Sequence, residues 1–137
     1  MKNETIDLEE AIEKSGGVDM RKSIGDVTSD ERGSGARYNG GKTRYDLIPL
    51  SALKSCADVF AYGEKKYAAW NWAKGMNWSV PYACAVRHFE AWQRGEDIDP
   101  ESGLPHIGHV MCNLIMLAHY EEHYPEGDDR PPADLFS

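Results

Sequence analysis

The middle of the chain places apolar residues three and four positions apart, which is the pattern of amphipathic helices. This pattern predicts three helices, over residues 50–68, 80–95 and 105–123. Pro81 and Pro105 suit the first turns of the second and third helices, and Ser79 suits the N-cap of the second. No stretch sustains the two-residue alternation of a strand, so we expect an all-α fold, a small helical bundle.

The two ends of the chain differ in composition from the helical part. From residue 15 onward the N-terminal segment is rich in Gly, Ser, Asp and Arg and holds few large apolar residues. We therefore expect residues 1–36 to form an extended, mobile arm, and residues 37–123 to form one helical domain. Residues 124–137 are acidic and contain several prolines, and we expect them to form a C-terminal tail.

Helical wheels indicate which residues of the first two helices face inward. In the first helix one stripe gathers Leu53, Ala57, Phe60, Glu64 and Tyr67. Glu64 is therefore expected on the buried face. In the second helix the apolar arc holds Ala85, His88, Phe89 and Trp92. We expect His88 to face inward and Glu90, on the opposite side, to face solvent.

The third helix is apolar almost all round, as buried helices are. The exception is a narrow stripe of four residues with polar groups, His106, His109, Asn113 and Tyr120. A buried polar or charged group is costly unless it is paired or bound to a metal. The convergence of Glu64, His88, His106 and His109 on inward faces therefore favours a ligand or metal site. A structural network of hydrogen bonds remains the alternative.

The loop between the second and third helices holds four carboxylates within six residues, Glu96, Asp97, Asp99 and Glu101. Such a loop is commonly a solvated turn, but here it leads directly into His106. Carboxylate oxygens suit Mg²⁺ or Mn²⁺, and the neighbouring imidazoles shift the preference toward Mn²⁺ or another transition metal. We expect Glu96, Asp99 and Glu101 to be metal ligands and Asp97 to face solvent.

The formal net charge is −8, and residues 35–47 form a net-positive stretch with three basic residues against one acidic residue. An acidic surface disfavours duplex nucleic acid, so we expect no nucleic-acid partner. A small phosphorylated ligand remains compatible with this charge if metal ions screen it. Lys42 and Arg44, next to two glycines, are candidate phosphate donors, although their spacing does not fit a P-loop. A turn with two surface cations is the alternative.

The expected compartment follows from apolar content and cysteine spacing. No apolar run approaches the roughly eighteen residues of a membrane span. The N-terminus also lacks the apolar stretch of a secretion signal. Cys56, Cys84 and Cys112 stand far apart in apolar segments, which is typical of small core residues in a reduced protein. We expect a cytoplasmic protein with no membrane partner.

Several motifs stand in order along residues 37–120. They are Gly-Gly-Lys42-Thr-Arg44-Tyr-Asp46, Tyr62-Gly63-Glu64-Lys65-Lys66-Tyr67, Asn71-Trp72, Arg87-His88, and the string from Gly95 to His106 followed by His109. Together they resemble the phage dATP/dGTP diphosphohydrolase family, which is related to the MazG-like all-α NTP pyrophosphatases. The resemblance implies metal-dependent hydrolysis of purine (deoxy)nucleoside triphosphates, mainly dGTP or GTP and also dATP, to the monophosphate and pyrophosphate. In some phages a similar enzyme supplies dGMP for 2-aminoadenine synthesis.

The resemblance and the residue patterns together give a candidate site. The candidate metal ligands are Glu64, His88, Glu96, Asp99, Glu101, His106 and His109, with Mg²⁺ or Mn²⁺ as the cofactor. Glu96 or Glu101 would accept the proton of the attacking water. The candidate substrate-binding residues are Lys42, Arg44, Lys66, Tyr67, Asn71, Trp72 and Asn113. Trp78 is a further aromatic residue that could stack on a base.

One departure from the MazG-like pattern bears on the metal. Those enzymes hold Mg²⁺ with a Glu-x-x-Glu pair and a Glu-x-x-Asp pair, and here His106-x-x-His109 stands where the second pair would open the last helix. The loop carboxylates and Glu64 become more necessary, because two imidazoles alone bind Mg²⁺ poorly.

Two other function classes stay open, and so does the assembly. One class is a non-catalytic regulator that binds a nucleotide or a metal. The other is an HD-type triphosphohydrolase, which needs a His-Asp dipeptide that none of the five histidines provides. A bundle this small commonly completes its core by self-association, so we expect a homo-oligomer, a dimer or a tetramer.

Overall fold

The computed structural model describes Arg37 and residues 40–137, and the expected arm over residues 1–36 lies outside the described residues. Contacts divide the chain into two compact units, Met1–Ile48 and Pro49–Ser137, and each is described by itself. In the first unit a short 3₁₀ helix, η2, spans Tyr45–Leu47. Beside it Arg44 donates two hydrogen bonds of 2.7 Å to Asp46, which raises the pKa of Arg44 and lowers the pKa of Asp46.

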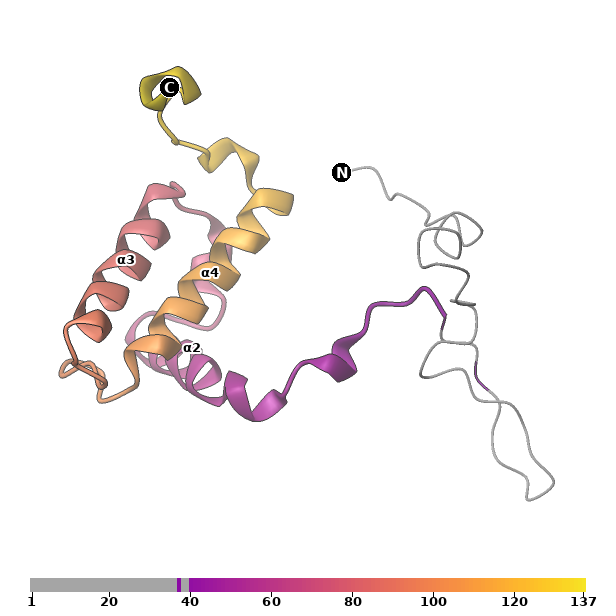
Figure 1. Cartoon of the computed structure of the whole chain (residues 1–137), viewed down its shortest axis with the longest axis vertical. Coiled ribbons are helices and arrows are strands. Elements are labelled where there is room, and N and C mark those ends of the chain that lie inside the picture. Colours follow the sequence, from indigo (N-terminus) through magenta and orange to yellow (C-terminus); the bar gives the residue numbers. More distant parts are fainter. Residues whose placement is uncertain (1–36, 38–39) are drawn as a thin grey trace. The chain divides into compact units, whose positions relative to one another are not determined.

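The second unit is built from three α-helices (Figure 1): α2 over Lys54–Lys66, α3 over Ser79–Gln93 and α4 over His106–His123. Four short 3₁₀ helices also lie in this unit: η3 (Leu50–Leu53), η4 (Asn71–Lys74), η5 (Pro125–Gly127) and η6 (Ala133–Phe136). Within the described residues there is no strand, and a single antiparallel bridge joins Ile98 to Pro105. The predicted all-α fold is therefore confirmed.

The start of α3 differs from the prediction that Ser79 caps it. Ser79 is the first residue of the helix, and both its backbone N–H and its hydroxyl donate hydrogen bonds to the carboxylate of Asp129. Asp129 thus satisfies one free backbone N–H at this helix end, which is the task we had expected of the Ser79 side chain. Pro81 lies in the first turn as predicted, whereas Pro105 directly precedes α4 instead of opening it.

Residues after α4 fold back onto the beginning of α3. The backbone N–H of Trp78 donates to the carbonyl of Gly127 at 2.9 Å, and its indole Nε1 donates to the carbonyl of Tyr124 at 3.0 Å. The guanidinium of Arg130 lies over the Trp78 ring, 4.9 Å from its centroid. The first part of the expected C-terminal tail is therefore packed against the helices.

Helix α4 packs against both α2 and α3 and so lies at the centre of the unit (Figure 1). Gly108 allows the close approach to α2, because a Cβ atom there would meet the carbonyl oxygen of Ser55 at 2.7 Å. Cys56 and Val59 of α2 and Cys112 of α4 form the buried core cluster. All three cysteines are free thiols; Cys56 and Cys112 are buried as expected of core residues, whereas Cys84 is half-buried. No helix among the described residues has the length and apolar character needed to span a membrane.

The polar stripe predicted on α4 is confirmed, since His106, His109, Asn113 and Tyr120 are all buried. The arc predicted on α3 is only partly right: Ala85 is buried and His88 is half-buried, but Phe89 and Trp92 are 45% and 46% exposed. The reason is that α3 packs mainly against α4, so neighbouring chain covers only a narrow stripe of it.

The inward stripe predicted for α2 is wrong about burial. Glu64 and Tyr67 are exposed, and the buried residues of this helix are Cys56 and Val59. Most of the predicted stripe, including Ala57, lines an open cavity, and Phe60 both lines it and packs against the core cluster. The periodic apolar stripe of α2 therefore lies along the wall of a cavity.

Candidate functional site

Three histidines meet where the end of α3 approaches the start of α4. His106 and His109 lie one turn apart at the beginning of α4, and His88 comes from α3. The rings of His88 and His109 stack, with centroids 4.1 Å apart and planes 7° apart. The Nδ1 atoms of His88 and His106 lie 2.8 Å apart. Two ring nitrogens at that distance need a proton between them or a cation beside them, because two lone pairs repel.

The loop between α3 and α4 brings carboxylates to these rings. Gly95, with φ at +97°, ends α3 in a conformation that favours glycine. Glu96 then accepts a hydrogen bond from Nε2 of His106 at 2.8 Å. When Nε2 carries the proton, Nδ1 of His106 keeps its lone pair and faces His88. Glu96 is thus positioned to fix the tautomer of His106.

Asp99 approaches the cluster from the same loop. Its carboxylate accepts a hydrogen bond from the backbone N–H of Ser102 at 3.1 Å and lies 3.5 Å from Nε2 of His109. The Ser102 hydroxyl is itself 2.7 Å from that nitrogen. The backbone N–H of His106 donates to the carbonyl of Asp97, which folds the loop back against α4. These contacts explain why the side chain of Asp99 is mostly covered.

The electrostatics keep these groups in the forms that bind metals. Burial lowers the pKa of His88, and the neighbouring His109 lowers it further. Burial also lowers the pKa of His109, which the nearby Asp99 carboxylate only partly opposes. Burial alone would raise the pKa of Asp99, but hydrogen bonds from Ser102 and Glu101 together with the nearby His109 lower that pKa. Neutral imidazoles and an ionised carboxylate are the states required of ligands.

One set of donors meets the distance requirement for a shared cation. His88, Asp99 and His106 each offer one ligand atom, and these atoms lie within 4.8 Å of one another. Two imidazoles and a carboxylate suit Mn²⁺ or a later transition metal better than Mg²⁺. The residues therefore fit a divalent transition metal.

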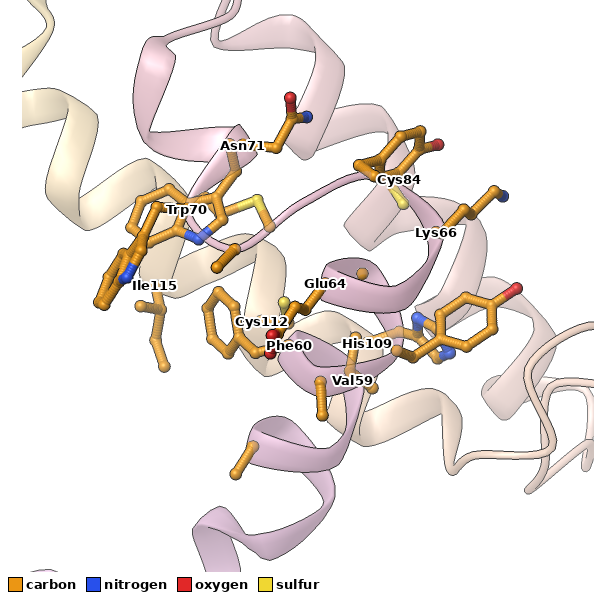
Figure 2. A pocket seen from close by; sticks show the side chains of 18 of the residues that line it. Val59, Phe60, Glu64, Lys66, Trp70, Asn71, Cys84, His109, Cys112 and Ile115 are labelled. Carbon is orange, nitrogen blue, oxygen red and sulfur yellow. The ribbon is translucent and has the colours of Figure 1, made fainter.

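A cavity of about 810 Å³ opens beside this cluster. Figure 2 shows Trp70 and Ile115 on one side of the view, His109 and Lys66 on the other, and Glu64 between them. Trp72, which also lines the cavity, packs against Phe60 and Trp70, whereas His88 and Asp99 lie against His109 and Glu101 accepts a hydrogen bond from Lys66. This volume and mixture are typical of a site for a small ligand with an aromatic part and a charged part.

Most of the residues that the sequence suggested for substrate or metal binding line this cavity. They are Glu64, Lys66, Tyr67, Asn71, Trp72, His88, Asp99, Glu101 and His109. Lys66 donates a hydrogen bond of 3.1 Å to Glu101, which raises the pKa of Lys66. His106 and Glu96 stand behind this lining, His106 buried and Glu96 in contact with it.

Two of the residues suggested for substrate binding, Asn113 and Trp78, make contacts within the protein. The side-chain amide nitrogen of Asn113 donates one hydrogen bond to the carbonyl of His109 at 2.8 Å and another to Sγ of Cys84 at 3.4 Å. Trp78 is buried against the chain after α4. Neither residue lines the cavity. Lys42 and Arg44 belong to the other compact unit, so their phosphate role stays a prediction.

Two residues of this region escaped the sequence patterns. Ser102 stands in the acidic loop, but nothing in its spacing indicated a contact with His109. Trp70 lines the cavity in a left-handed backbone conformation, with φ at 62° and ψ at 14°. No periodicity carries that information, although its place beside Asn71-Trp72 was a usable hint.

Comparison with known proteins agrees with the motifs. The family model described as "dATP/dGTP diphosphohydrolase, N-terminal" matches residues 32–130. The chain belongs to this family. A curated relative, a dATP/dGTP diphosphohydrolase of Salmonella phage PMBT28, is 30% identical over 97 residues, which make up 71% of this chain. The match spans 33% of the relative, so this chain corresponds to about a third of that protein. No solved structure matches the chain.

Proposed function

We propose that this chain hydrolyses purine deoxynucleoside triphosphates, with dGTP ahead of dATP, to the monophosphate and pyrophosphate. The observation that carries the proposal is the cavity, which joins an aromatic side to a cluster of three histidines and loop carboxylates. A nucleotide has the same division, with a flat base at one end and a charged phosphate chain at the other. The relative's name, dATP/dGTP diphosphohydrolase, supports this class of substrate.

His88, Asp99 and His106 would hold the divalent cation, because their donor atoms lie within 4.8 Å of one another. Mn²⁺ is favoured over Mg²⁺ by the two imidazoles. Bound there, the cation would neutralise phosphate charge and lower the pKa of a water molecule. The carboxylates of Glu64 and Glu101 also line the cavity and are available to a second cation or to water.

The residues around the ligands have separate tasks in this proposal. Glu96 holds His106 through Nε2 and keeps Nδ1 free, which is the role of a carboxylate behind a metal-binding histidine. Glu101 reaches the cavity and is the better candidate to accept the proton of the attacking water. Lys66, paired with Glu101 at 3.1 Å, would exchange that partner for a phosphate oxygen when substrate binds.

Product analysis tests this function. Purified protein is incubated with dGTP and Mn²⁺ or Mg²⁺, with and without a chelator, and the products are separated by chromatography. Equal amounts of dGMP and pyrophosphate, formed only without chelator, are expected. Orthophosphate released through dGDP would indicate a phosphatase, and deoxyguanosine with inorganic triphosphate would indicate a triphosphohydrolase. Absence of any metal-dependent product from dGTP, dATP, dCTP, dTTP and GTP would remove the enzyme function.

A further inference from the structure

Trp70 has a backbone conformation that a bulky residue rarely adopts. Its φ of 62° and ψ of 14° place it in the left-handed region, and among the described residues it is the only non-glycine with a positive φ. The Cβ atom of an L-residue crowds the following carbonyl there, so the conformation costs free energy. Such strain persists only where the surrounding structure imposes it, and it concentrates at binding and catalytic sites.

The surroundings of Trp70 impose this conformation through a tight turn. The backbone N–H of Asn71 donates to the carbonyl of Ala68, and the N–H of Ala73 donates to the carbonyl of Trp70. Trp72 then anchors the turn to the helices. The ring centroids of Trp72 and Phe60 lie 5.7 Å apart, and the carbonyl of Trp72 accepts a hydrogen bond from the hydroxyl of the fully buried Tyr120.

The strained turn sends the indole of Trp70 out over the cavity. Trp70 is 72% exposed although it lines the cavity, and its ring tilts 43° against Trp72 with centroids 6.1 Å apart. Trp72 packs against rings of α2 and α4. Among the ring pairs of the described residues, Trp70 contacts only Trp72. Burying a large apolar surface is favourable, so the exposed indole forgoes stabilisation that burial would give.

We infer that Trp70 is the stacking platform for the purine base of the substrate and the source of purine selectivity. The inference rests on the proposed function, since it assigns the base end of the same cavity. Trp70 lies away from His109 and Lys66 in Figure 2, so a base stacked on it would leave the phosphates directed toward the histidines and loop carboxylates. A purine offers a larger face to the indole than a pyrimidine does, and stacking strength follows overlap. The half-buried Asn71 beside it lines the same cavity and can hydrogen-bond the edge of the base.

The decisive variant is Trp70→Gly, because it removes the indole and the strain together. Glycine adopts positive φ without steric strain, and relief of that strain should keep the thermal midpoint equal or raise it. Binding of dGMP, a ligand that needs no hydrolysis, should weaken by about tenfold or more, as expected for loss of a base stacking on an aromatic ring. Binding of inorganic triphosphate, which has no base, should stay unchanged. Trp92→Ala is the matched control, because Trp92 is also exposed and does not line the cavity.

Two further readouts separate stacking from a structural role. Trp70→Phe keeps an aromatic face and should retain most of the affinity for dGMP, even if the glycine variant folds poorly. In hydrolysis assays Trp70→Gly should raise KM for dGTP more than for dTTP and so reduce the preference for purines. Unchanged dGMP binding by Trp70→Gly, or equal losses for dGMP and inorganic triphosphate, would overturn the inference. If the parent protein binds dGMP but hydrolyses no nucleotide, the proposed function fails and the stacking role stands. If the parent binds no purine nucleotide, both fail.

Discussion

The imidazole of His88 lies flat against the imidazole of His109, with ring centroids 4.1 Å apart and planes 7° apart. Positive charges on both rings would repel one another at this distance, and burial already lowers the pKa of each ring. The stack is therefore a neutral arrangement. Joined to His106 through the Nδ1 contact of 2.8 Å, it places two helices and one loop around a common set of ligand atoms.

This relationship predicts how metal-free stability depends on pH. In the unfolded chain both histidines titrate near their ordinary pKa of about 6.5, whereas in the folded chain their pKa values are lower. As the pH falls below about 6.5 the unfolded chain takes up protons first, so the free energy of unfolding decreases. Urea denaturation in chelator should give a lower midpoint at pH 5.5 than at pH 7.5. The variant with His88→Gln and His109→Gln should lose less between these pH values, and equal losses in the two proteins would contradict the neutral stack.

Removal of His106 tests the metal centre without touching the aromatic side of the cavity. His106→Ala should lower metal-dependent turnover by about a hundredfold or more, because even the loss of an outer partner of a metal ligand typically costs 10–100-fold. Helical content by circular dichroism should change little. The control is His123→Ala, since His123 is an exposed histidine at the end of the same helix. Near-normal activity of a folded His106→Ala protein would make His106 a structural residue.

Glu96 and its neighbour Asp97 separate a positioning role from general loop acidity. Glu96 contacts Nε2 of His106, whereas Asp97 is exposed and is not in the donor set around the histidines. Glu96→Gln should weaken Mn²⁺ affinity by about 10–100-fold, and Asp97→Asn should leave it nearly unchanged. Isothermal titration with Mn²⁺ measures both. Parallel losses would show that the loop acts only through its net charge.

Glu64 and Glu90 offer a second matched pair, because both are exposed glutamates on helices. Glu64 lines the cavity, whereas Glu90 forms a surface pair with Arg94 at 3.1 Å. Glu64→Gln should reduce kcat/KM for dGTP by about tenfold if its carboxylate meets a cation or water there. Glu90→Gln should keep full activity and stay within about 0.5 kcal/mol of the parent in stability, since exposed pairs contribute little. Equal kinetics for the two variants would remove Glu64 from the site.

The sequence predicted the helices and the polar stripe of α4 because both depend on local periodicity. His106, His109, Asn113 and Tyr120 repeat at helical spacing on an otherwise apolar helix, and α4 packs against both α2 and α3. The same reasoning placed Phe89 inside, although it is 45% exposed. Periodicity identifies an apolar face but not whether another element covers it.

The finer details of the site depend on backbone geometry that a single sequence does not express. Glu96 and Asp99 stand three positions apart in one acidic loop, yet one contacts His106 from behind and the other joins the donor set. The turn conformation decides between these roles. Trp70 is the extreme case, because its left-handed backbone runs against the preference of its residue type.

In the proposed function, water attacks the α-phosphorus of a purine triphosphate held between the aromatic residues of the cavity and the histidine cluster. Hydrolysis of dGTP in ¹⁸O-labelled water, followed by mass spectrometry of both products, measures this directly. The label should enter dGMP, with unlabelled pyrophosphate, and the reaction should require Mn²⁺ or Mg²⁺. Label in the pyrophosphate would show attack at the β-phosphorus, and label in orthophosphate would show stepwise removal of phosphates; either result would contradict the proposed geometry.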